Sequence, residues 1–110
     1  MSKNSILRYR EKMALSDKYD FEFLKNEAET LIFKELERQF AFFEEGDLCL
    51  CNECVVDMAA MALNAVKPLY RVSLLGTLYA NSAMQDEEYA ENVRLAVSNA
   101  IEKVGFNPAH

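Results

Sequence analysis

The chain has 110 residues, 51% of them hydrophobic and 27% charged, which is the composition of one folded domain and excludes a disordered tail. Its formal net charge of −6 at pH 7 argues against general binding to DNA or RNA, which usually requires a basic surface. No apolar run approaches the roughly 20 residues of a transmembrane helix, and the first residues lack the apolar core of a secretion signal. We therefore expect a cytoplasmic protein that does not bind membranes.

Residues 1–18 are predicted to form a polar arm, and residues 19–110 a single domain. The basic side chains of the arm include Lys3, Arg8, Arg10 and Lys12. Asp17 or Asp20 can cap the helix that follows.

A long amphipathic helix is predicted from Phe21 to Phe43, because apolar residues recur there every three or four positions. The opposite side is rich in glutamate, so Glu29, Glu35 and Glu37 are expected on a solvated face. Residues 44–47 follow, and their sequence, EEGD, predicts a turn.

A second helix is predicted from Val55 to Val66, with Asn52 as its N-cap and Pro68 beyond its end. Residues 58–63 are apolar on every side, as in a helix at the centre of a fold or in a subunit interface. Apolar and polar residues then alternate over 69–75, which predicts a short strand. A single strand needs a partner, and its own copy in a second subunit can provide one.

The last predicted element is a helix that ends near Val104. Its start is open, because Ser82 and Gln85 form a capping box while Thr77 can already be helical. Gly105 is expected to end the helix in the left-handed conformation. The sequence thus predicts a mainly α fold in a two-fold dimer: a long first helix, a buried central helix, a short strand and a long C-terminal helix.

The three cysteines, Cys49, Cys51 and Cys54, lie within six residues of one another. This clustering is unlike a disulfide framework and indicates metal or redox chemistry. Zinc suits three thiolates and takes four ligands, and the fourth can come from His110 or from the terminal carboxylate. An iron–sulfur cluster and three metal-free thiols are the alternatives. Cys54 is expected in the first turn of the second helix, where the helix dipole favours a thiolate.

No arrangement of residues suggests catalysis, because the sequence has one histidine, no glycine-rich phosphate loop and no acidic metal motif. The protein is not expected to be an enzyme. Arg38 on the first helix, with Tyr70 and Arg71 on the strand, can hold a phosphate or stack on a base. The alternative interpretation is ordinary surface charge.

Three stretches carry a resemblance to a known family. They are LKNEAETLIFKELERQF at residues 24–40, CLCNECVVDMAAMALNAVKPLYRV at residues 49–72 and AIEKVGFNPAH at residues 100–110. With them, the chain resembles the late-competence ComFB family of bacteria over about residues 21–110.

The resemblance implies a small, mostly helical homodimer whose cysteine-bearing members bind zinc. Carried over by position, Cys49, Cys51 and Cys54 correspond to zinc ligands, and His110 to the candidate fourth. The resemblance also implies a regulatory protein, because members are assigned as receptors for cyclic di-GMP or cyclic di-AMP that are linked to competence, pili or motility. Such a receptor would act on a protein partner. A zinc-stabilised adaptor without nucleotide and a cysteine-based redox sensor are the rival hypotheses.

Overall fold

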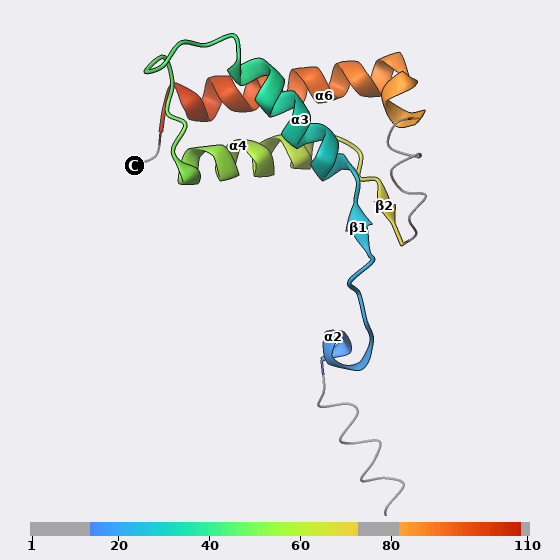
Figure 1. Ribbon diagram of the computed structural model, residues 1–110. Helices are drawn as coiled ribbons and strands as arrows, with labels where there is room; N and C mark the ends of the chain where they lie inside the picture. Colours follow the sequence, from blue (N-terminus) through green and yellow to red (C-terminus); the bar gives the residue numbers. More distant parts are fainter. Residues whose placement is uncertain (1–13, 73–81, 109–110) are drawn as a thin grey trace, which may run out of the picture.

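In the computed structural model, which describes residues 14–72 and 82–108, three helices form the body of the protein (Figure 1). They are α3 (Ala28–Phe40), α4 (Asn52–Ala65) and α6 (Glu87–Ala100), and α6 continues into a π-helical turn, η1 (Ile101–Gly105). A short helix α2 (Leu15–Lys18) and the strands β1 (Lys25–Asn26) and β2 (Tyr70–Arg71) are also present. The predicted mainly α fold with a long C-terminal helix is confirmed.

The core lies where α3 crosses α4 and α6 (Figure 1). Ile32 of α3, Met58 of α4, and Val93 and Val97 of α6 are fully buried there. Burying one such side chain stabilises a fold by about 1.5–3 kcal/mol, so this contact among three helices is the main source of stability.

The first long helix begins at Ala28, seven residues later than the sequence pattern suggested. Asn26 sets this boundary, because its side-chain Oδ1 accepts hydrogen bonds from the N–H groups of Ala28 (3.1 Å) and Leu69 (2.8 Å). Glu27 holds the N-cap position without a side-chain bond, so Asn26, one residue earlier, supplies the capping oxygen through the first bond. The second bond ties the chain before β2 to the same side chain. The capping residue is therefore neither Asp17 nor Asp20.

The two ends of the apolar stripe predicted for Phe21 to Phe43 lie outside α3. Phe21 and Leu24 precede β1 and are 43% and 44% exposed. At the other end α3 stops at Phe40, and Phe43 lies in tight turns beyond it, where its N–H donates to the Phe40 carbonyl (3.1 Å). Periodicity therefore overstated the length of the helix.

The strand has its partner within the chain. β2 pairs with β1 in antiparallel register, with Lys25 opposite Arg71 and Asn26 opposite Tyr70. The strand is thus not completed by a second subunit, which corrects the sequence-based expectation. Residues 73–75 of the predicted strand lie outside the described residues.

The central helix α4 is buried along one face. Cys54, Met58 and Ala62, spaced four residues apart, form its buried stripe. Val56 and Met61 on its other sides are 56% and 38% exposed. The apolar character all round the helix therefore leaves an uncovered apolar surface on the single chain.

The C-terminal helix buries the stripe that its sequence predicted, including Val93, Val97 and Ile101. Gly105 behaves differently from the prediction, because Gly46 is the glycine with a positive φ (92°) among those described. A Cβ at Gly105 would lie 3.2 Å from Met58 Cε and 3.3 Å from Leu48 Cβ. The absence of a side chain at Gly105 thus permits close packing against α4.

Within residues 14–72 and 82–108, no helix combines the length and apolar composition that a membrane span requires.

Replacing Asn26 with Ala should lower the free energy of unfolding by about 1–2 kcal/mol, because one side-chain oxygen serves both the cap of α3 and the chain before β2. Asn26→Asp is the matched control, since it keeps an oxygen acceptor and should retain most of the stability. Urea unfolding followed by circular dichroism measures both. Equal stability of the Ala variant and the parent would contradict this role.

Candidate metal centre and a basic hollow

The cysteine cluster is built by the start of α4. Cys51 is the N-cap residue, with extended backbone dihedrals, and its Sγ accepts a hydrogen bond from the Cys54 N–H at 3.4 Å. This corrects the prediction that Asn52 caps the helix. Cys54 lies in the first turn, as predicted, and is 1% exposed, whereas Cys49 and Cys51 are half-buried. The three Sγ atoms lie within 4.8 Å of one another.

The end of the C-terminal helix closes against the same cluster. The Cys49 N–H donates to the Gly105 carbonyl at 3.0 Å, which joins residues far apart in the sequence. Phe106, the next residue, packs edge-to-face on Phe43, with ring centroids 6.0 Å apart. The loop after α3, the start of α4 and the end of η1 therefore meet at the sulfur atoms.

The electrostatics of the cluster favour a proton or a cation among the sulfur atoms. Burial is the largest cause that raises the pKa of Cys54, and together with hydrogen bonds and charge from Cys49 and Cys51 it brings this pKa to about 12. The predicted preference for thiolate at the helix N-terminus is thus outweighed in the metal-free protein. A bound metal cation reverses this balance, because it stabilises the thiolates that crowd one another.

The donor set fits a tetrahedral metal ion. Zinc–sulfur bonds of about 2.3 Å place tetrahedral sulfur ligands roughly 3.8 Å apart. The three Sγ atoms, all within 4.8 Å of one another, need only small rotamer adjustments to reach that spacing. His110, the predicted fourth ligand, lies outside the described residues, although the chain leading to it leaves from Gly105 beside the cluster.

Arg38 lies in the last turn of α3, where it pairs with a glutamate. Its Nε and Nη2 donate to the two carboxylate oxygens of Glu35 at 2.9 and 2.6 Å, and its guanidinium lies 5.7 Å from the ring centroid of Phe42. Glu35 is 7% exposed, so its predicted place on a solvated face is wrong. It faces α6, because Gln39 donates both to Glu35 and to the carbonyl of Arg94.

Tyr70 and Arg71 lie on β2, beside the beginning of α3, and Arg71 Nη1 donates to the Tyr70 carbonyl at 2.5 Å. Arg38 is ten residues beyond the first residue of α3, about 15 Å along the helix at about 1.5 Å per residue. The structure therefore does not bring Arg38 together with Tyr70 and Arg71 in one chain.

Arg38 instead shares a hollow with Arg94, which the sequence analysis did not single out. The hollow lies between α3 and α6, has a volume of about 400 Å³, and includes Gln39, Phe42 and Ser98 in its lining. Arg94 pairs with Glu91, one turn earlier on α6. Arg38 and Arg94 each lie next to the buried stripe of their helix. This position in the sequence pattern could have indicated that the packing of α3 on α6 brings the two side chains together.

Together, the fold and the cluster define a small, mainly helical protein with three thiols placed to hold a metal ion. The chain belongs to the late competence development ComFB family: the profile described as "Late competence development protein ComFB" matches residues 25–108. Membership makes it a competence-related regulatory protein and confirms the resemblance seen in the sequence. A search of curated proteins found no match.

Replacing Glu35 with Gln should destabilise the protein by about 1 kcal/mol at pH 7, because charged hydrogen bonds to Arg38 and Gln39 are weakened. Burial raises the pKa of Glu35, but these bonds and the charges of Arg38 and Arg94 outweigh it, so that the pKa falls below its usual 4.5. A carboxyl whose pKa is lower in the folded than in the unfolded chain stabilises the fold at pH values above its unfolded pKa. This stabilisation is lost as the pH falls through its folded pKa.

The difference in unfolding free energy between the parent and Glu35→Gln should therefore shrink as the pH is lowered below 4.5. Denaturation at a series of pH values measures it. Glu37→Gln, an exposed position on the same helix, is the control and should behave like the parent. A difference that does not change with pH would contradict the ionic role of Glu35.

Proposed function

We propose that the protein is a zinc-stabilised homodimeric regulator that binds a cyclic dinucleotide and passes this state to a protein partner. The observation that carries the zinc part is the gathering of three sulfur atoms at the N-terminus of α4. The nucleotide part is supported by the ComFB resemblance and by the hollow that contains Arg38 and Arg94.

Zinc fits this site better than the alternatives. Zinc favours tetrahedral thiolate coordination and has no redox chemistry of its own, which suits a structural role beside a buried core. Cys54 belongs to both the cluster and the core, so metal binding is coupled to folding. Cys49, Cys51 and Cys54 are three ligands, and His110 is the proposed fourth.

Purified protein should contain about one zinc ion per chain by elemental analysis. Cys51→Ser should lose the metal and lower the melting temperature in parallel, because metal-binding energy contributes to folding. Glu53→Gln, which changes an exposed acid between two of the cysteines, should keep both. His110→Ala should weaken zinc binding without abolishing it.

The structural zinc site would be ruled out if the purified parent protein contained no zinc and melted at the same temperature as the Cys51→Ser variant. Three thiols that react readily with mild oxidants in the metal-loaded protein would favour the redox-sensor hypothesis instead.

The hollow between α3 and α6 has the chemistry that a phosphodiester requires. The side chains of Arg38 and Arg94 are 52% and 45% exposed, and arginine donates to phosphate oxygens through two N–H groups at once. Phe42 is 76% exposed beside Arg38 and offers an aromatic face for a base. Glu35 and Glu91, which now pair with the arginines, must share them with the ligand.

Titration calorimetry of metal-loaded protein against cyclic di-GMP and cyclic di-AMP tests this function. Binding to one of them should weaken about tenfold in Arg94→Gln, which corresponds to roughly 1.4 kcal/mol, and should weaken further with added salt. Lys103→Gln, on η1 outside the hollow, should bind like the parent.

A loss of binding in Arg71→Gln but not in Arg94→Gln would move the site to β2. No heat with either nucleotide would leave the adaptor hypothesis, in which the zinc-stabilised dimer engages a protein partner without nucleotide. The exposed side of α4 that carries Val56 supports this second candidate and the dimer alike.

A further inference from the structure

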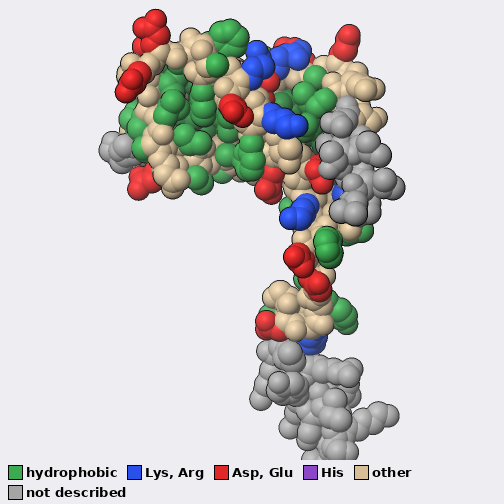
Figure 2. All heavy atoms as spheres, in the orientation of Figure 1, with side chains coloured by type: hydrophobic (Ala, Val, Ile, Leu, Met, Phe, Trp, Pro, Cys, Tyr) green, Lys and Arg blue, Asp and Glu red, His purple; other side chains and the backbone are tan. Residues whose placement is uncertain are grey.

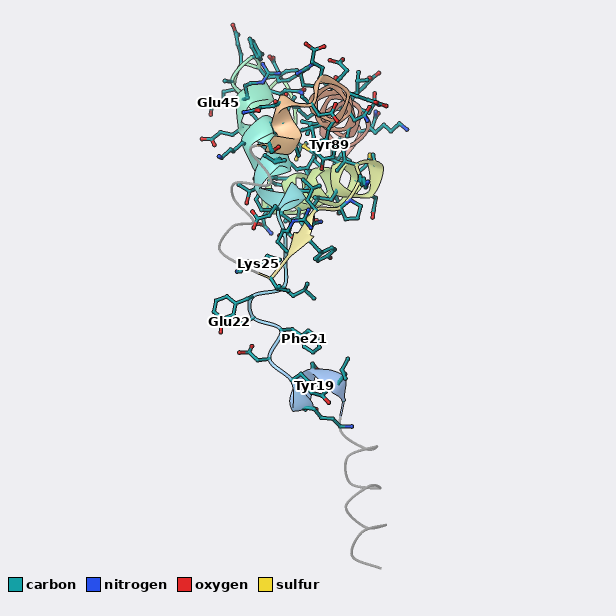
Figure 3. All side chains as sticks on the ribbon, turned by 90° about the vertical axis from the view of Figure 1, so that its right-hand side faces the viewer. Tyr19, Phe21, Glu22, Lys25, Glu45 and Tyr89 are labelled. Carbon is teal, nitrogen blue, oxygen red and sulfur yellow. The ribbon has the colours of Figure 1, made fainter. Side chains whose placement is uncertain are left out.

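A segment before the first strand projects away from the body of the protein. This projecting segment, residues 14–24, contains α2 and leaves the three helices in a direction of its own (Figures 1 and 3). Five of its side chains are large, apolar and between 43% and 63% exposed: Leu15, Tyr19, Phe21, Phe23 and Leu24. Figure 3 shows Tyr19 and Phe21 standing out from the chain. The end of the predicted polar arm therefore overlaps with a segment whose exposed side chains are largely apolar.

Among the described residues, few contacts hold the shape of the projecting segment. Its hydrogen bonds run inside the segment, for example from the Tyr19 N–H to the Leu15 carbonyl (3.2 Å) and from the Leu24 N–H to the Phe21 carbonyl (3.0 Å). The helix α2 is one turn long and has no buried residue. A single turn is unstable alone in water, so a surface outside the segment must stabilise it.

The body offers an apolar groove of matching character. The groove lies between α3 and α4 and has a volume of about 320 Å³. Its lining is almost entirely apolar and includes Phe33 and Phe40 of α3 with Val55, Val56 and Ala59 of α4. Phe33 and Val56 are half exposed, and Figure 2 shows hydrophobic side chains gathered over this face. An exposed apolar groove is a surface to which another apolar side chain can bind.

The strand pairing makes the partner's groove the accessible one. β1 is paired with β2, and Asn26 is bonded to the chain before β2, so the chain is anchored from residue 25 onward. The projecting segment, which ends at residue 24, extends outward from this anchor (Figure 1). The groove lies farther along α3, between residues 33 and 40. A second copy related by a two-fold axis presents the same groove, and reciprocal exchange of segments closes the assembly.

Charge favours the same exchange. Residues 1–13 carry four basic and one acidic side chain, whereas residues 25–110 carry seven basic and fourteen acidic ones. The basic N-terminal sequence that precedes the projecting segment is therefore attracted to the acidic body of a second copy. The family match begins at residue 25, so the projecting segment is outside the part that the family profile describes.

We propose that each protomer inserts its projecting segment, with Phe21 and Phe23 as the main contacts, into the α3–α4 groove of its partner. This inference rests on the dimer in the proposed function and assigns the contact that holds the two chains together.

Sedimentation velocity on the full-length, metal-loaded protein tests the exchange. The parent should sediment as a dimer. The segment variant Phe21→Asp/Phe23→Asp and the groove variant Val56→Asp should each raise the dimer dissociation constant at least tenfold, because a charge is placed in an apolar contact. Met61→Asp changes an exposed apolar side chain of α4 outside the groove lining, and it should sediment like the parent.

Mixing the two variants distinguishes exchange between chains from contact within one chain. A mixed dimer has one intact segment facing one intact groove, so dimer should reappear when the segment variant is added to the groove variant. Far-UV circular dichroism and zinc content check that each variant is folded. Phe33→Asp, at another half-exposed position of the groove, replaces Val56→Asp if that variant loses helicity.

A monomeric parent would overturn both the dimer and the exchange. A dimeric parent whose segment and groove variants are equally dimeric would overturn the exchange and leave the dimer in place. Weakened variants that do not recover dimer on mixing would also overturn it, since the segment would then act within its own chain. The nucleotide and zinc measurements stand independently of all three results.

Discussion

Three sulfur atoms are held within 4.8 Å of one another at the point where α4 begins and the C-terminal helix ends. The sulfur atoms join the loop after α3 to the first turn of α4, and the hydrogen bond from the Cys49 N–H to the Gly105 carbonyl adds η1 to the same point. Cys54 makes the coupling direct, because its thiol lies in the core with Met58 and Val97. Gly105 can approach Met58 and Leu48 only because it has no side chain. The position of the C-terminal helix on α4 therefore depends on the cysteine loop.

The crowding of these thiols explains why a metal ion suits the site. Without one, burial and the neighbouring sulfur atoms keep Cys54 protonated, with a pKa near 12. A cation removes the protons and turns mutual repulsion into shared coordination. The basic hollow of Arg38 and Arg94 lies on another face, between α3 and α6. Structural support and ligand sensing are thus separated in this proposal, with α3 contributing to the core, the hollow and the apolar groove.

Features encoded by neighbouring residues could be predicted from the sequence, and features that depend on distant contacts could not. The cysteine cluster, α4 and the buried stripe of α6 follow from local spacing. The start of α3 does not, because Asn26 caps it while also bonding Leu69, 43 residues away. Glu35 looked solvated because the packing of α6 beside it cannot be seen in a helix pattern, although its bonded partners Arg38 and Gln39 lie on the same helix. The pairing of Arg38 with Arg94 in one hollow likewise required the packing of two helices.

The central claim is that the three cysteines hold one metal ion, and X-ray absorption at the zinc edge tests it most directly. The fine structure of the purified protein should show three sulfur neighbours at about 2.3 Å and one lighter atom, nitrogen or oxygen, at about 2.0–2.1 Å. The same spectrum from Glu53→Gln should be identical. A shell of oxygen and nitrogen alone, or fewer than three sulfur atoms per zinc, would contradict the account.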